Sequence, residues 1–135
     1  MMKIIIDTNV WISFLLGKRL SSLKEIFAKD EIKIYVSDIL LKEISDVASR
    51  KKFHGKINQD SLFLLFELIR QRCISVSPLG EVSENYVRDP NDKFLLQMAH
   101  AVKADYLITG DLDLLVLKKF EGTSILTFSE FLQYF

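Results

Sequence analysis

The sequence is poor in the residues that small proteins use to replace a large core. Its 135 residues include one cysteine, five glycines and two prolines. Cys73 cannot form a disulfide within the chain, and one cysteine with two histidines excludes a cysteine-rich zinc site. A chain of this length buries about 65–70% of its extended surface, so hydrophobic burial alone can stabilise it. We expect one helix-rich domain over residues 1–135.

The sequence also lacks a long apolar run and a net charge. No stretch of about 18 apolar residues is present, and Asp7 interrupts the apolar start Ile4-Ile5-Ile6, so we expect neither a membrane helix nor a signal peptide. A cytoplasmic protein is therefore expected. The 18 basic and 18 acidic residues sum to zero, which argues against nucleic-acid binding through a strongly basic domain.

The zero net charge hides an uneven distribution. Five acids discussed below leave 18 minus 13, or +5, on the rest of the chain. The densest basic group is Arg50-Lys51-Lys52. A basic triplet is usually a solvated helix end, so it predicts RNA binding only together with the acids. An acidic pit within a mildly basic surface suits a phosphodiester substrate that is reached through a metal ion.

Strand-like and helical segments alternate along the chain. This alternation implies βαβ crossovers and a parallel sheet covered on both faces, with ligands beyond the carboxyl ends of the strands. The Ile4-Ile5-Ile6 run indicates a strand buried on both faces. Strands are predicted at Lys3–Ile6, Ile32–Val36, Ile74–Val76, Tyr106–Thr109 and Ile125–Leu126. Helices are predicted at Val10–Leu16, Ser21–Lys29, Asp38–Ser49, Gln59–Arg72, from Asp89 to about Val102, at Asp111–Leu117, and after a Thr127–Glu130 capping box.

Three carboxylates follow predicted strands. Asp7 comes directly after the first strand, and Asp111 follows Gly110, which permits a tight turn after Tyr106–Thr109. Asp113 lies in the helical turn that comes next. Each of the three is also a plausible helix cap, and we expect one of the Asp111 and Asp113 pair to cap. The carboxyl end of a parallel strand is nevertheless where such sheets bind ligands, which favours a site.

Two further carboxylates are predicted to lie on apolar sides of helices. At about 100° per residue, Glu43 falls inside the apolar arc of its helix, between Ile39 and Val47. A charge there is costly unless it is paired or bound to metal. The alternative is that Glu43 reaches out to the rim or pairs with a base. Asp92 is predicted to point to the buried side of its helix, although an acid at this position also helps any helix start. Asp89 is assigned as the cap or as a residue that supports the site.

Five converging acids would repel one another strongly without a cation. Hard oxygen ligands select Mg²⁺ or Mn²⁺ rather than zinc, and one or two such ions polarise a phosphate and lower the pKa of bound water. The sequence offers no other nucleophile: there is no serine in a strand–turn–helix elbow, no Cys–His pairing and no Gly-rich phosphate loop. His54 and His100 are predicted to be solvated.

Five short motifs are spread in order over nearly the whole chain. They are Ile5–Val10, Ser37–Ile44, Arg88–Phe94, Tyr106–Leu114 and Ile125–Leu132. Each motif is weak alone, but in this order and spacing they resemble the PIN-domain nucleases. The resemblance is greatest to the branch described as toxins of bacterial and archaeal type II toxin–antitoxin pairs.

The resemblance implies a three-layer α/β/α sandwich with a central parallel sheet. It also implies Mg²⁺- or Mn²⁺-dependent endonucleolytic cleavage of single-stranded RNA, and an antitoxin partner that covers the acidic cleft. It assigns metal binding to four acids: Asp7, Glu43, Asp92 and Asp111. Asp113 matches a further acid that only some branches of the family carry. Thr8, Asn9 and Thr109 match positions that orient the acids or the attacking water.

Several alternatives stay open. The chain would also fit an RNA-processing nuclease without an antitoxin, or a non-catalytic RNA-binding domain with a structural metal, although the complete acid set argues against the latter. A phosphoryl-transfer enzyme with Asp7 as covalent acceptor ranks low, because Asp7-Thr8-Asn9 lacks the paired-aspartate start of familiar phosphatases. The apolar stripe of Gln59–Arg72, which includes Phe63, would suit a homodimer interface, but a core role is commoner.

Overall fold

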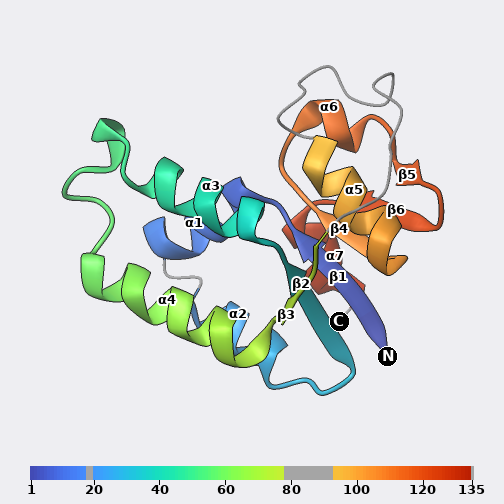
Figure 1. Cartoon of the computed structure of the whole chain (residues 1–135), viewed down its shortest axis with the longest axis horizontal. Coiled ribbons are helices and arrows are strands. Elements are labelled where there is room, and N and C mark those ends of the chain that lie inside the picture. Colours follow the sequence, from blue (N-terminus) through green and yellow to red (C-terminus); the bar gives the residue numbers. More distant parts are fainter. Residues whose placement is uncertain (18–19, 78–92, 135) are drawn as a thin grey trace.

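The computed structural model describes residues 1–17, 20–77 and 93–134, which form a mixed sheet flanked by helices (Figure 1). The strands are β1 Met2–Ile6, β2 Ile32–Val36, β3 Ile74–Ser75, β4 Tyr106–Ile108, β5 Lys119–Phe120 and β6 Thr123–Leu126. The helices are α1 Thr8–Leu16, α2 Leu20–Phe27, α3 Asp38–Ala48, α4 Gln59–Arg72, α5 Lys93–Val102, α6 Leu112–Leu115 and α7 Phe128–Tyr134, with a 3₁₀ turn η1 at Lys51–Phe53.

The six strands lie in the order β3-β2-β1-β4-β6-β5, with β1 in the middle of the sheet. β1 pairs in parallel with both β2 and β4, and the β2–β3 and β4–β6 pairs are parallel as well. The predicted parallel sheet is therefore confirmed for five strands. β5 was not predicted; it pairs antiparallel with β6, as the two-residue connection between them requires.

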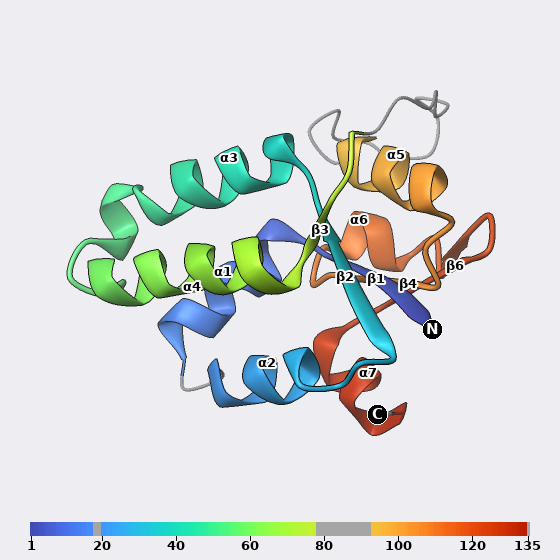
Figure 2. The ribbon, with the colours of Figure 1, turned by 60° about the horizontal axis from the view of Figure 1, so that its bottom comes forward.

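Helices cover both faces of this sheet. Figure 2 shows α5 on one side of the strands and α2 and α7 on the other, which confirms the three-layer α/β/α sandwich. α3 packs against α1, and α3, η1 and α4 together project beyond the edge of the sheet (Figure 1). No described helix combines the length and apolar character needed to cross a membrane.

The core is built around the central strand. Ile4, Ile5 and Ile6 are all fully buried, as expected for a strand covered on both faces. On one side, the ring of Phe14 makes edge-to-face contacts with Trp11 and Phe128, with centroids 5.9 and 5.1 Å apart. This packing fixes α1 and α7 under the carboxyl end of β1, and so fixes the backbone from which Asp7 projects.

Capping residues explain where α3 begins, but two apolar side chains are more exposed than the sequence pattern predicts. Ser37 caps α3 by accepting a hydrogen bond from the Leu40 N–H at 3.2 Å, and α3 begins at Asp38, as predicted. The prediction that Ile39 faces the core is wrong, because its side chain is 52% exposed. Phe63, in the apolar stripe of α4, is 69% exposed. Both lie on helix faces that no other described element covers completely.

Candidate metal centre

The centre of the candidate site is the carboxyl end of β1. β1 has β2 on one side and β4 on the other, so the chain crosses over in opposite directions from it. Such a switch point leaves a crevice beyond the strand ends, where doubly wound sheets bind ligands. Asp7 is the first residue after β1 and lies at this point.

A single threonine hydroxyl joins Asp7 to the end of β4. Thr109 Oγ1 donates a hydrogen bond to Asp7 Oδ2 at 2.6 Å and accepts one from the Asp111 N–H at 3.0 Å. Thr109 is fully buried and Asp7 is only 6% exposed. The contact therefore holds one carboxylate and the backbone of a second acid in a fixed arrangement, shielded from solvent.

The surroundings of Asp7 oppose its negative charge. Asp7 occupies the N-cap position of α1, yet its side chain makes no capping hydrogen bond. Burial is the largest influence and raises the pKa of Asp7 above its ordinary value; the Thr109 hydroxyl and the Thr8 N–H lower it, and the charges of Glu43 and Asp111 raise it further. Two more acids thus lie close enough for their charges to act on Asp7.

Glu43 reaches the site from α3. It is partly buried, and its Oε2 accepts a hydrogen bond at 3.0 Å from the hydroxyl of Thr8, which is 2% exposed. The hydrogen-bond partner of Glu43 is therefore the Thr8 hydroxyl on α1. Pairing of Glu43 with a base, which was one of the alternatives, is not seen among the described residues. Because Ile39 is exposed, the apolar arc of α3 is narrower than predicted, and Glu43 lies at its border.

Asp111 and Asp113 have different positions in the structure. Asp111 caps α6, since its Oδ1 accepts a hydrogen bond from the Asp113 N–H at 2.9 Å. This confirms that one member of the pair is a cap. Asp113 is partly buried in the first turn of α6. Asn9 is exposed on α1 and lines, with Thr109, a separate pocket of about 250 Å³.

The described residues bring three of the five predicted acids, Asp7, Glu43 and Asp111, into one electrostatic neighbourhood. Within residues 1–17, 20–77 and 93–134, however, no three His, Cys, Asp or Glu side chains are arranged to hold an ion. Asp92 and Asp89 lie outside these residues. The donor set consists of carboxylate and hydroxyl oxygens, which fits Mg²⁺ or Mn²⁺ and does not fit a soft metal.

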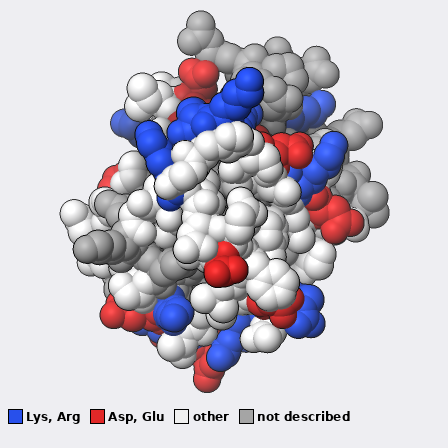
Figure 3. Space-filling model, turned by 90° about the vertical axis from the view of Figure 1, so that its left-hand side faces the viewer, with Lys and Arg blue, Asp and Glu red and all other residues white. Residues whose placement is uncertain are grey.

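Basic side chains lie beyond the end of α3, in the turn that leads to α4. Figure 3 faces the turn between α3 and α4 and shows Lys and Arg side chains gathered along one margin of it; Arg50, Lys51 and Lys52 are exposed in this turn. Of the three, only Arg50 lines the groove between α3 and α5 that Glu43 also lines. Lys52 Nζ instead lies 5.0 Å from the centre of the Phe53 ring. The sequence interpretation missed this groove, although its α3 residues follow helical spacing.

The sequence and the fold both match known proteins. Residues 3–113 match the family model of the PIN domain. An uncharacterized protein of Methanocaldococcus jannaschii is 28% identical over 119 residues, which cover 86% of this chain and 75% of that protein.

Three solved structures share the fold. VapBC2 from Rickettsia felis, bound to a DNA fragment from its promoter, superposes with a TM-score of 0.60 at 17% identity, covering 92% of this chain and 97% of that one. The PIN domain endonuclease Utp24 gives a TM-score of 0.53 at 19% identity, covering 91% and 82%. The PIN domain of T. brucei RRP44 gives 0.52 at 16% identity, covering 98% and 80%.

Proposed function

The chain belongs to the PIN domain family of nucleases, and from this premise we propose that it is a Mg²⁺- or Mn²⁺-dependent endoribonuclease that cleaves single-stranded RNA. The observation that carries the proposal is the convergence of Asp7, Glu43 and Asp111 at the switch point of the sheet. Burial and mutual repulsion raise the pKa of Asp7, so this arrangement is unfavourable in the absence of a cation.

The proposed ligands of the principal ion are Asp7, Asp92 and Asp111. Glu43 helps to hold the ion or positions the attacking water, and Asp113 serves a second ion. A bound Mg²⁺ or Mn²⁺ would neutralise charge on the scissile phosphate and lower the pKa of bound water.

The protein's own contribution is to fix the carboxylates before substrate arrives. The Thr109 hydroxyl holds one oxygen of Asp7, and the Thr8 hydroxyl holds one oxygen of Glu43. Asp111 uses Oδ1 to cap α6, which fixes the direction of its side chain. Because these contacts are already formed, little reorganisation is needed when the phosphodiester enters.

The test is cleavage of a panel of structured and unstructured RNAs with Mg²⁺, with Mn²⁺ and with EDTA. We expect the unstructured RNAs to be cut in the presence of either ion and to survive in EDTA. Asp7→Asn and Asp92→Asn should abolish cleavage without lowering the melting temperature. Undiminished cleavage by either variant would overturn the assignment of the site.

A second candidate role is that of a toxin held inactive by an antitoxin. It is supported by the match in fold to the VapBC2 complex over nearly the full length of both chains. In this role a helical or extended antitoxin segment covers the acidic cleft and places a basic side chain against the carboxylates. A small adjacent reading frame with a DNA-binding pattern would support it, whereas a gene set among RNA-processing enzymes would favour a housekeeping nuclease.

We also propose a homodimer through α4, where Phe63 and Leu64 are 69% and 44% exposed. Light scattering at several concentrations measures the oligomeric state. If Phe63→Ser leaves an observed dimer intact, the interface lies elsewhere.

A further inference from the structure

A groove of about 580 Å³ lies between α3 and α5, and its lining includes Glu43 of the candidate site. Its α3 side consists of residues three or four positions apart, which therefore share one face of the helix. Glu43 belongs both to this face and to the carboxylate cluster, so the groove adjoins the site at this residue. The α3 residues that line it are Ile39, Lys42, Glu43, Asp46 and Val47, and Arg50 lines it from just beyond the end of the helix.

Lys42 and Arg50 place two positive charges on the α3 side of this groove, and Lys93 lines it from α5. Lys42 lies within α3 and Arg50 just beyond its end, so the two charges occupy different points along the groove. Both side chains are exposed, and no hydrogen bond or ion pair joins either of them to another described residue. Both cations are thus available to a ligand.

The floor of the groove is apolar next to these charges. Ile39 is 52% exposed although it lies on a helix that packs against α1, and Val47 and Phe94 line the groove as well. Apolar side chains beside isolated cations match a flexible strand that carries phosphates on one side and bases on the other. They match a continuous acidic surface less well, because Asp46 lies between the two cations.

We propose that the α3–α5 groove is the path of the single strand as it leaves the cleavage site, with backbone phosphates at Lys42 and Arg50. The proposal rests on the nuclease function proposed above. It assigns a phosphate contact to Arg50 but none to Lys51 or Lys52, which do not line the groove. An acidic peptide would also meet the two cations, but a substrate bound at Glu43 has to pass the mouth of this groove.

Binding can be measured without cleavage. Cleavage is prevented by the substitution Asp111→Asn and by EDTA. The affinity for a fluorescent, unstructured oligoribonucleotide is then measured by titration at several salt concentrations. Each phosphate contact contributes about 0.7 to the slope of log affinity against log salt for a single strand. Lys42→Ala and Arg50→Ala should each reduce the slope by about 0.7, which is about fivefold weaker binding at 0.1 M salt.

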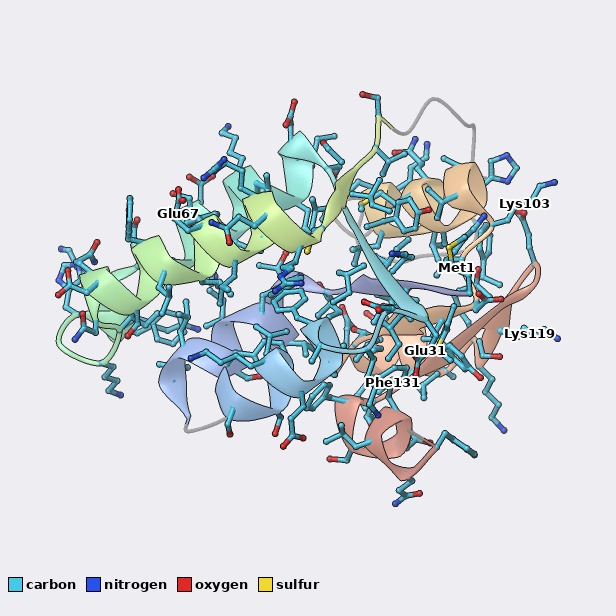
Figure 4. The ribbon with its side chains drawn as sticks, turned by 90° about the horizontal axis from the view of Figure 1, so that it is seen from below. Met1, Glu31, Glu67, Lys103, Lys119 and Phe131 are labelled. Atoms are coloured by element: carbon cyan, nitrogen blue, oxygen red, sulfur yellow. The ribbon has the colours of Figure 1, made fainter. Side chains whose placement is uncertain are left out.

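Two further variants control for charge and for fold. Lys119→Ala removes an exposed lysine of β5, which lies at the end of the molecule opposite α4 (Figure 4), and should leave the slope unchanged. Asp46→Asn should strengthen binding, because it removes a negative charge between the two proposed phosphate positions. Its effect has the opposite sign from that of the lysine and arginine variants, which general loss of structure would not produce.

The outcomes separate this proposal from the nuclease proposal. An unchanged salt slope in Lys42→Ala with Arg50→Ala would overturn the strand path and leave the groove to a protein partner, even if the wild-type protein cleaves RNA. Weaker binding in Asp46→Asn would likewise overturn the placement of phosphates in the groove. Failure of wild-type cleavage with both ions would overturn the nuclease proposal and is measured independently.

Discussion

Thr109 provides a sharp test of the site because one buried hydroxyl serves two of its acids. Its Oγ1 donates to Asp7 Oδ2 at 2.6 Å and accepts from the Asp111 N–H at 3.0 Å, and the residue is fully buried. Valine has nearly the same shape but no hydroxyl. Thr109→Val therefore removes both contacts while it preserves the packing of the methyl group.

The size of the effect follows from the two lost contacts. A hydrogen bond to a charged group contributes about 1.5–3 kcal/mol, and a buried N–H left without a partner costs about 1–3 kcal/mol. The two losses share one oxygen, and Asp7 can take up a proton, so we expect about 2–4 kcal/mol in total. For a chain of this size one kcal/mol shifts the melting temperature by about 3–4 °C. The expected decrease is therefore about 6–16 °C.

Thermal unfolding followed by circular dichroism at neutral pH in EDTA measures this decrease. Thr109→Ser is the matched control, because it keeps the hydroxyl and loses one methyl group, at a cost of about 0.8 kcal/mol or somewhat more. A valine variant as stable as the wild type would refute the reasoning. So would a serine variant as unstable as the valine variant, since the hydroxyl would then not be the important group.

Three other predictions follow from burial and charge. Asp7→Asn should raise the melting temperature in EDTA and remove any stabilisation by Mg²⁺, because the raised pKa of Asp7 means that its charge opposes folding at neutral pH; a lower melting temperature in EDTA would contradict this. Burial raises the pKa of Cys73 to about 12, so the thiol should react with iodoacetamide at pH 8 far more slowly than in the urea-unfolded protein. Leu65→Ala, at a fully buried position of α4, should cost the monomer about 2–5 kcal/mol, whereas Phe63→Ala on the exposed face should cost the monomer less than about 1 kcal/mol. Equal losses in urea unfolding would show that the two faces of α4 are wrongly assigned.

The sequence was sufficient wherever a local pattern determines the outcome. Three consecutive isoleucines indicate a strand covered on both faces, and the end of that strand places Asp7 at the carboxyl ends of the parallel strands. Both α3 and α4 begin at the predicted residues, Asp38 and Gln59, and in the structure Ser37 and Asn58 cap them through hydrogen bonds within three residues. Parallel order followed from the alternation of strands and helices.

Contacts between residues far apart in the sequence could not be predicted from local sequence patterns. The hydroxyl of Thr109 meets Asp7 across 102 positions, and that of Thr8 meets Glu43 across 35. No periodicity encodes such pairs; only the resemblance to a family suggested that these hydroxyls matter. Ile39 was predicted to be buried and is exposed. Helical periodicity alone does not show that α3 and α5 leave a groove at that position. The antiparallel β5 is two residues long and has too little sequence for a period-two signal.

The environment of Asp7 links these observations to the function. Its folded-state pKa is raised, so the energetic cost is absent below the unfolded-state pKa, grows as the pH rises toward the folded-state value, and is complete above that value. A side chain selected for stability alone would not be held in this position. The hydroxyl of the fully buried Thr109 nevertheless donates a hydrogen bond that holds the Asp7 carboxylate in place. A cation bound at neutral pH would turn the repulsion among Asp7, Glu43 and Asp111 into attraction, which gives the arrangement a physical reason that folding does not supply.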